Sequence, residues 1–374
     1  MSATPQSTTI APATPPRIRV LVVDDSNLQR ALLIALLSAD PDFEVVGTAK
    51  DGFQAIEQAK ALLPDVITMD LRMPGMDGLK AAQEIMASQP TPILLVTASI
   101  SRDDQRLVAS AFSAGILAIV AKPSVNAHEL HDEFRRMVKG VSRVKLARRH
   151  ASQPSTPLGP RAGAAPEQRS IMRSSLAAMP AHVKRLEVIG IASSTGGPQV
   201  LEQILSTLPV NFPVPVLIVQ HIAHGFAPSL VEWLDSRCHL PVRIAEIGLP
   251  LTPGVWIGDG QHLVVRAGRF GLSREPSVSG HCPSGTVLFN SLATEFGAAA
   301  LGVILTGMGE DGALGLRALH DAGGVTIAQN ASSSVIHGMP GAAIRLGAAD
   351  FALPPEDIAR AILDFARRGR SLQW

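Results

Sequence analysis

In the first half of the sequence, polar side chains suited to phosphoryl chemistry directly follow or end four apolar runs. Asp24 and Asp25 follow one run, Asp70 ends another, and Thr97 and Lys122 end two later ones. Carboxylates that gather repel one another unless a cation joins them, and Mg²⁺ prefers such oxygen ligands. One carboxylate can then attack a phosphoryl group, while the lysine offsets its charge. A single aspartate in such a place is more often a helix N-cap, but the whole set favours a phosphoryl-transfer site.

In the second half, a serine, a histidine and an aspartate stand in similar places. Ser194 lies in IASSTGGP, His221 follows PVLIVQ, and Asp311 lies in the glycine-rich LTGMGEDG. Each one alone is compatible with a strand-to-helix turn, a structural histidine or an N-cap. Together they favour a nucleophile, the base that takes its proton and the acid that fixes the tautomer of the base. The chain order Ser, His, Asp differs from the orders in chymotrypsin, subtilisin and the α/β-hydrolases.

The elements that would position the first group form five β/α units. Their strands are continuous apolar runs separated by helical patterns, which is typical of a parallel sheet covered on both faces. We predict a doubly wound, flavodoxin-like domain over residues 17–140, with the polar residues at the carboxyl edge of its sheet. The predicted strands are 18–25, 43–49, 65–70, 93–98 and 116–123, and the predicted helices lie near 31–39, 52–62, 78–88, 103–113 and 126–139.

A second α/β domain, Rossmann-like, is predicted over residues 186–374. Three short strands between 242 and 275 have no helix between them, so we expect a β-hairpin there. The predicted strands are 186–192, 215–221, 242–247, 254–259, 262–267, 301–307 and 324–329, and the helices lie near 198–207, 228–236, 285–297, 311–320 and 355–368.

The segment between the two domains, residues 141–185, has a different composition and is predicted to be a flexible linker. From Lys139 to Arg185 there are ten lysines and arginines and one acid, Glu167, and the middle is rich in Pro, Ser, Ala and Gly. Such a segment buries too little apolar surface to offset the entropy of ordering. Its charge indicates either a solvated tether or a docking segment for an acidic partner.

Length and composition limit the class of protein. The chain has 374 residues, 46% of them hydrophobic, and 33 basic against 32 acidic residues give a net charge of +1. This balance argues against a global nucleic-acid or membrane-binding surface. The two cysteines, Cys238 and Cys282, imply no disulfide framework and favour a reducing, cytoplasmic location. No apolar run reaches the roughly 18 residues of a membrane helix, and residues 1–16 are predicted to be a disordered lead-in rather than a secretory signal.

The first domain resembles the receiver domain of bacterial response regulators. The resemblance implies that Asp70 accepts phosphate from a histidine kinase phosphodonor and that Thr97 and Lys122 contact the phosphoryl group. Mg²⁺ would be bound by Asp24, Asp25, Asp70 and the backbone carbonyl of Arg72. Many receivers carry an aromatic residue on the fifth strand, where this chain has no aromatic residue and Ile119 or its neighbours take that place. The motifs that carry the resemblance are DD at 24–25, DLRMPGMDG at 70–78, Thr97 and KP at 122–123.

The second domain resembles the catalytic domain of the chemotaxis protein-glutamate methylesterases, the CheB family, which has the same receiver–linker–esterase order. The resemblance implies that Ser194 is the nucleophile, His221 the base and Asp311 its orienting partner. Thr195 and the backbone amide of Met308 would help to bind the substrate and the oxyanion. The motifs are STGG (194–197), QH (220–221), LTPGVWIGDG (251–260), ILTGMGEDG (304–312), TIAQ (326–329) and GMP (338–340).

The implied function is a phosphorylation-activated hydrolase, acting as a monomer in chemotactic adaptation. It would remove methyl groups from glutamate γ-methyl esters on the cytoplasmic helices of chemoreceptors, release methanol, and deamidate receptor glutamine, without a cofactor for hydrolysis. It would neither bind nucleic acid nor insert into the membrane. The alternative is a receiver-regulated binding module in a two-component pathway outside chemotaxis. Because a long linker transmits little strain, control of the esterase would come from a docked interface between the domains.

The chain departs from the family pattern at three places near these motifs. Ala192 and Ser193 stand where the family usually has glycine and alanine, so Ser193 is a second serine beside the nucleophile. The family segment His-Arg-Pro-Ser-Val-Asp is His-Cys-Pro-Ser-Gly-Thr at residues 281–286. Glu310 precedes Asp311 where the family often has asparagine.

Overall fold

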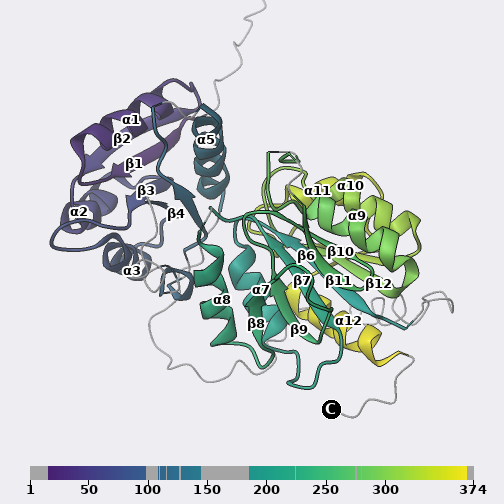
Figure 1. Cartoon of the computed structure of the whole chain (residues 1–374). Coiled ribbons are helices and arrows are strands. Elements are labelled where there is room, and N and C mark those ends of the chain that lie inside the picture. The colour runs from purple at the N-terminus through teal and green to yellow at the C-terminus, as the bar shows by residue number, and fades with distance from the viewer. Residues whose placement is uncertain are drawn as a thin grey trace, which may run out of the picture.

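The structure is a computed structural model that describes residues 16–97, 108, 110–114, 116–125, 128–144, 185–223, 225–273, 276–278 and 280–368. Two parallel sheets, each with helices packed against it, lie side by side (Figure 1). The predicted lead-in and most of the predicted linker fall outside the described residues. None of the described helices has the length and apolar character that a membrane span requires.

The first sheet has five parallel strands in the order β2-β1-β3-β4-β5. This is the flavodoxin-like order that the alternating apolar and helical patterns predict, with a switch point between β1 and β3. Asp24 follows β1 and Asp70 ends β3, so both carboxylates lie beside this switch point. The strands are β1 (Ile18–Val23), β2 (Phe43–Ala49), β3 (Val66–Asp70), β4 (Ile93–Thr97) and β5 (Ala118–Ala121).

Local sequence sets the starts of the helices around this sheet. The side chains of Ser26, Asp51 and Asp77 each accept a hydrogen bond from the backbone N–H three residues later, which caps α1, α2 and α3. The helices are α1 (Asn27–Ser38), α2 (Gly52–Leu62), α3 (Gly78–Ser88) and α5 (His128–Ser142). Helix α5 runs two residues past the predicted domain end at 140. The helix predicted near 103–113 is described only in part, and residues 108 and 110–113 are helical.

The second sheet has seven parallel strands in the order β14-β13-β12-β6-β7-β9-β8. The strands that follow β6, namely β7 to β9, lie on one side of it, and the strands that follow β12 lie on the other side. The switch point of the sheet is therefore between β6 and β12. The strands are β6 (Val188–Ser193), β7 (Pro215–Gln220), β8 (Val242–Ile244), β9 (Gly254–Ile257), β12 (Ala300–Ile304), β13 (Val325–Gln329) and β14 (Phe351–Leu353). All residues of β6, β7, β9, β12 and β13 are buried, as expected for strands covered on both faces.

Helices cover both faces of this sheet and bury separate apolar clusters. One cluster includes residues of α7, α8 and α12, and the other includes residues of α9, α10 and α11. The helices are α7 (Gly197–Leu205), α8 (Ala227–Asp235), α9 (Gly285–Glu295), α10 (Ala313–Asp321), α11 (Met339–Arg345) and α12 (Pro355–Arg367), with a short 3₁₀ turn at Gly297–Ala299. The predicted fold class, two doubly wound parallel-sheet domains, is confirmed.

The region from 242 to 275 differs in detail from the prediction. A hairpin is present, but it joins β10 (His262–Arg266) to β11 (Arg269–Ser273), whereas β8 and β9 extend the main sheet. The sequence analysis missed β11, as well as the short elements β14 and α11. Ala267 and Gly268 at the hairpin turn both have positive φ, 50° and 68°, which matches the twist of a two-residue hairpin.

The receiver sheet meets the second domain through its β4–β5 side. The backbone N–H of Gly196 donates to Leu117 O over 3.0 Å, and the Gln199 amide donates to Ile116 O over 2.8 Å. Phe112 packs against Trp233 of α8 with ring centroids 5.4 Å apart. One apolar cluster runs through both domains at this point. The loop that follows β6 is therefore tied directly to the receiver.

Candidate functional site

Ser194 follows β6 and begins the turn into α7. Its N–H donates to Thr306 O over 3.0 Å, and its carbonyl accepts from the Gln220 amide over 2.8 Å, so its backbone is held from both neighbouring strands. Gly196 has φ +76°, which a left-handed turn into the helix requires. A Cβ on Gly197 would lie 2.2 Å from Gln220 Oε1. The two glycines thus allow the close approach of turn and neighbouring strand.

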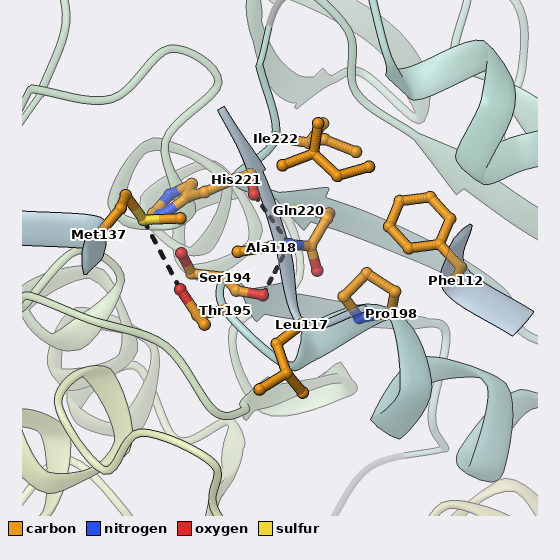
Figure 2. Close-up of a pocket in the computed structure, with 11 residues that line it drawn as sticks. Phe112, Leu117, Ala118, Met137, Ser194, Thr195, Pro198, Gln220, His221 and Ile222 are labelled. Atoms are coloured by element: carbon orange, nitrogen blue, oxygen red, sulfur yellow. Dashed lines mark hydrogen bonds between the residues drawn. The ribbon is translucent and has the colours of Figure 1, made fainter. Parts of the chain in front are cut away.

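Ser193, the second serine of the pair, has a different environment. It is fully buried, and its hydroxyl donates to Gln220 Oε1 over 2.6 Å. This bond follows from the strand register, which places Ser193 beside Gln220. Ser194, in contrast, lines a pocket together with His221 (Figure 2). The geometry therefore favours Ser194 over Ser193 as the nucleophile.

His221 and Asp311 form a direct pair across the switch point. His221 Nε2 lies 2.8 Å from Asp311 Oδ2, which fixes Nε2 as the nitrogen that carries the proton. His221 Nδ1 is buried and has no hydrogen-bond partner among the described residues. In Figure 2 the His221 ring lies beside Ser194. Nδ1 is thus the ring nitrogen available to take a proton from a nucleophile.

The Asp311 carboxylate is buried within a set of hydrogen-bond donors. Oδ1 accepts from Ser284 Oγ at 2.6 Å and from Thr286 N at 3.2 Å, and Oδ2 also accepts from Gly285 N at 2.6 Å. Burial alone would raise the pKa of Asp311. The hydrogen bonds from His221, Ser284 and Gly285 outweigh that effect and hold its pKa well below the usual range. Asp311 is therefore ionised at neutral pH.

A second imidazole stacks on His221. The rings of His281 and His221 are 3.8 Å apart between centroids, with an angle of 6° between their planes. Burial, together with the nearby His221, lowers the pKa of His281 to about 4. His281 is therefore neutral at neutral pH. It packs against the face of the His221 ring without placing a positive charge next to that ring.

Thr195 and Met308 both face the receiver. The Thr195 hydroxyl lies 3.7 Å from Met137 Sδ of α5. A Cβ on Gly140 would lie 2.6 Å from Met308 Cε, so α5 also passes close to Met308. Within the described part of the chain, the Met308 N–H donates to no backbone carbonyl.

The pocket at Ser194 is formed by both domains. Figure 2 shows Ser194, Thr195 and His221 close together, with receiver residues such as Met137 and Leu117 among the side chains around them. Ile119, on the strand where many receivers carry an aromatic residue, is one of the receiver residues that line the pocket. The receiver contributes Phe112, Leu117, Ala118, Ile119 and Met137 to the lining.

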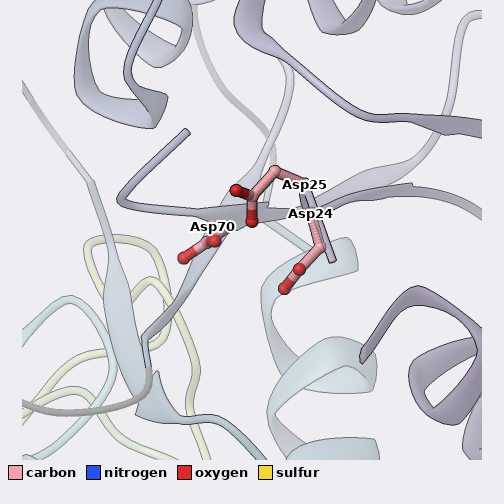
Figure 3. Close-up of side chains that lie close together, drawn as sticks. All are labelled: Asp24, Asp25 and Asp70. Carbon is pink, nitrogen blue, oxygen red and sulfur yellow. The ribbon is translucent and has the colours of Figure 1, made fainter. Parts of the chain in front are cut away.

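The three aspartates of the receiver lie together at its carboxyl edge (Figure 3). Asp24, Asp25 and Asp70 each offer a carboxylate oxygen, and these oxygens lie within 4.8 Å of one another. Lys122 Nζ lies 2.7 Å from Asp24 Oδ2 and 2.8 Å from Asp70 Oδ2. Three carboxylates against one ammonium leave negative charge in excess. The all-oxygen donors and this charge fit a hard divalent cation.

The pKa values of this cluster reflect burial and pairing. Burial raises the pKa of Asp70, as does the nearby Asp24, against the opposing effect of Lys122. Burial would lower the pKa of Lys122, but its hydrogen bonds to both aspartates outweigh this and raise it. The Arg72 N–H lies 3.4 Å from Asp70 Oδ1, and Thr97 ends β4 one residue beyond the partner of Asp70. The structure thus brings the predicted residues to one edge.

Comparison with known proteins bears on both sites. Residues 20–135 match the response regulator receiver domain family, and residues 189–362 match the CheB methylesterase family. A relative from Syntrophus aciditrophicus, named protein-glutamate methylesterase/protein-glutamine glutaminase 1, is 42% identical over 93% of this chain and 98% of its own. The chain belongs to the CheB methylesterase family.

A second curated relative and a solved structure are also similar to this chain. A relative from Anaeromyxobacter dehalogenans, named protein-glutamate methylesterase/protein-glutamine glutaminase 3, is 45% identical over 94% of this chain and 100% of its own. Among solved structures, the CheB methylesterase catalytic domain of Thermotoga maritima is 36% identical. It covers 48% of this chain and 98% of its own, with a TM-score of 0.47.

Two of the positions that depart from the expected family pattern, 192 and 285, lie against each other in space. A Cβ on Gly285 would lie 2.6 Å from the Ala192 Cβ. With alanine at 192, glycine at 285 therefore avoids a close contact between the two residues. Thr286, in place of the usual aspartate, accepts from Gly312 N over 2.8 Å. Glu310 is exposed. The donors around Asp311 are thus retained.

Three residues of the site were not assigned a role from the sequence. Gln220 bonds the Ser193 hydroxyl and the carbonyls of both Ser194 and His221. His281 stacks on the base, and Ser284 donates to Asp311 while capping α9. For Gln220, the signal was its position beside His221 at a strand end. The roles of His281 and Ser284 depend on long-range packing against His221 and Asp311, which no local sequence pattern indicates.

A serine-reactive probe distinguishes Ser194 from Ser193. A fluorophosphonate should label the wild-type chain at Ser194, should fail to label Ser194→Ala, and should still label Ser193→Ala, because that hydroxyl serves Gln220. Peptide mapping by mass spectrometry gives the labelled residue. Labelling that disappears in Ser193→Ala but persists in Ser194→Ala would reverse the assignment.

Proposed function

We propose that Ser194, His221 and Asp311 form the triad with which this protein-glutamate methylesterase and protein-glutamine glutaminase hydrolyses chemoreceptor side chains. The observation that carries the proposal is the His221–Asp311 pair at 2.8 Å, whose second ring nitrogen is buried without a partner beside the Ser194 pocket. Both activities are named in relatives that match nearly the whole chain. The substrate would be a glutamate γ-methyl ester or a glutamine on a cytoplasmic receptor helix, so the protein would act in the cytoplasm.

The proposed reaction begins with transfer of the Ser194 hydroxyl proton to His221 Nδ1. The oxygen attacks the ester carbonyl, and the free N–H of Met308 is suited to stabilise the oxyanion that forms. Asp311 stabilises the imidazolium through Nε2. The proton then passes from His221 to the leaving methoxide, and methanol departs. Water attacks the acyl-enzyme with His221 again as base, which yields the carboxylate and restores Ser194. With glutamine, ammonia leaves instead of methanol.

Methanol release tests this function. Membranes that carry methyl-labelled receptors should release methanol with the wild-type chain, whereas Ser194→Ala should lose on the order of 10⁴-fold in rate, because the nucleophile is gone. The fold of the variant is checked by circular dichroism. Tight binding of receptors without methanol release would instead favour the alternative, a receiver-regulated binding module.

The receiver is proposed to be the control element, with Asp70 as the phosphate acceptor. Its carboxylate would attack the phosphoryl group of a histidine kinase or a small phosphodonor, and Lys122 and Thr97 would contact that group. Asp24, Asp25, Asp70 and the Arg72 carbonyl would hold Mg²⁺, which offsets the charge of the phosphoryl group when it is bound. The support is the oxygen cluster within 4.8 Å and the double contact of Lys122.

Phosphorylation can be followed by labelling. A radiolabelled small phosphodonor with Mg²⁺ should label the wild-type chain and should fail to label Asp70→Asn, since an amide cannot act as the nucleophile. Asp132→Asn is the control, because this receiver carboxylate has 70% of its side chain exposed and lies outside the cluster. Addition of EDTA should also prevent labelling. A labelled Asp70→Asn chain would place the phosphate on another residue.

The proposed mode of control is a receiver that covers the esterase pocket until phosphorylation weakens its docking. It is supported by the pocket lining, by the two hydrogen bonds from the Ser194 loop to the receiver, and by the Phe112–Trp233 contact. Phosphorylation can shift the equilibrium between the covered and the uncovered pocket only if the phosphoryl group stabilises one of these two states more than the other.

Weakening the interface should therefore imitate phosphorylation. Loss of an aromatic pair costs roughly 0.5–1.5 kcal/mol, and about 1.4 kcal/mol is tenfold in an equilibrium. Phe112→Ala should raise the methanol-release rate of the unphosphorylated chain by up to about tenfold and reduce its further activation by phosphodonor. Phe53→Ala is the matched control, because Phe53 is 64% exposed on α2. Equal rates for all three chains would rule out covering as the mode of control.

A further inference from the structure

His262, the first residue of β10, is fully buried and uses both of its ring nitrogens. The backbone N–H of Ser284 points at Nδ1 over 3.1 Å, and Nε2 lies 3.2 Å from the carbonyl of Pro276. An amide nitrogen can only donate, so Nδ1 must be unprotonated. The ring proton is then on Nε2, which donates to the carbonyl. His262 is thus fixed as one neutral tautomer by two backbone groups of opposite kind.

These two backbone groups belong to the segment that approaches the catalytic histidine. Pro276 lies at the beginning of this segment and Ser284 at its end, where α9 starts. Between them, Val278 and His281 exchange two backbone hydrogen bonds of 3.0 and 3.1 Å, which hold these two residues side by side. His281 then stacks on His221 at 3.8 Å. The imidazole of His262 therefore fastens both ends of the segment that carries the stacking ring.

The end at Ser284 also determines the hydrogen bonds of Asp311. The Ser284 hydroxyl donates to Asp311 Oδ1 over 2.6 Å, and Gly285 N, the next amide, donates to Oδ2 over 2.6 Å. Both donors move with the Ser284 backbone. A shift of this backbone would change the direction of the Asp311 carboxylate, and with it the His221 ring that bonds to Oδ2.

We propose that His262 is a positioning residue for the hydrolytic step, which it serves by orienting Asp311 through Ser284 and His221 through the His281 segment. The proposal rests on the proposed function of the triad. His262 is not among the residues that line the pocket at Ser194, and its two hydrogen bonds within the described part of the chain go to backbone groups rather than to Ser194, His221 or Asp311. Loss of the acceptor that it offers to the Ser284 N–H should therefore lower kcat and leave the substrate KM nearly unchanged.

Two substitutions separate the roles of the two nitrogens. The Oδ1 of asparagine is attached to Cγ, as His Nδ1 is, so His262→Asn keeps an acceptor for Ser284 N–H. The amide of glutamine lies one bond further out, so His262→Gln keeps a donor for the Pro276 carbonyl but removes the acceptor at Nδ1. Each variant leaves one backbone group of the segment without its hydrogen-bond partner. The two variants therefore lose the same number of hydrogen bonds and differ only in which one is lost.

The measurement is methanol release from methyl-labelled receptor membranes by the full-length protein, together with the rate of fluorophosphonate labelling of Ser194. His262→Gln should lower kcat and the labelling rate on the order of 10- to 100-fold, because small misplacement of catalytic groups has effects of this size. His262→Asn should stay within about threefold of wild type, and KM should change by less than about twofold in both. Thermal melting compares their stabilities.

The controls separate failure of this inference from failure of the proposed function. His239→Gln, at an exposed histidine, should behave as wild type. A wild-type rate no greater than that of Ser194→Ala would reject the function itself. An active wild type with equal losses in His262→Asn and His262→Gln would reject the positioning role. Where His262→Gln does not fold, His262→Asn alone decides, and a loss well beyond threefold in that folded variant overturns the proposal.

A double mutant tests the route through Ser284. Ser284→Ala removes the hydroxyl that donates to Asp311 but keeps the backbone N–H that His262 accepts. If His262 acts mainly through this serine, His262→Gln should cost clearly less in the Ser284→Ala background than in wild type. Independent, multiplicative losses would overturn this route.

Discussion

The ionised carboxylate of Asp311 is the constraint on which the esterase domain depends. A buried charge without partners is very costly, so the fold must bring donors to it. These donors come from the start of α9 and from His221, whereas Asp311 itself lies between β12 and α10. Satisfying one charge therefore sets the relative position of a helix end, two strand ends and the turn between them.

The same requirement explains why Ser194, His221 and Asp311 lie at the switch point of the sheet. After β6 the chain continues toward one edge of the sheet, and after β12 it continues toward the other edge. The connections that follow these strands therefore diverge, which leaves a crevice at the carboxyl ends of β6, β7 and β12. Gln220 then joins the backbones of the nucleophile and the base. The receiver uses the switch point of its own sheet for its three aspartates. Two unrelated reactions thus depend on the same property of parallel sheets.

The elements that sequence patterns predicted well are those whose signals are local. The bounds of α2 and α3 agree with the prediction because Asp51 and Asp77 cap them and an apolar periodicity follows. The triad residues could be named because each directly follows or lies close to a strand end. The role of Gln220 depends on the register that places it beside Ser193, and the donors to Asp311 come from residues about 26 positions away. A local sequence pattern spans only a few residues, so it cannot indicate contacts between residues that are this far apart in the sequence.

Other features escaped prediction for equally physical reasons. The hairpin strand β11 follows a turn in which Ala267 has a positive φ, a conformation for which alanine gives no signal. The contact between Ala192 and Gly285 joins two departures from the family pattern that are far apart in sequence. Their proximity depends on the folded chain and on no local sequence pattern.

The pocket lined from both domains has a consequence for the order in which signals act. If a receptor helix binds at Ser194, it must compete with the receiver for the surface around Ser194 and Thr195, so only one of them can occupy it at a time. Linkage between two equilibria is reciprocal. If phosphate on Asp70 favours the uncovered state, an abundant receptor substrate must in turn favour the phosphorylated receiver. The density of methylated receptors would then itself be an input to the switch, in addition to the kinase.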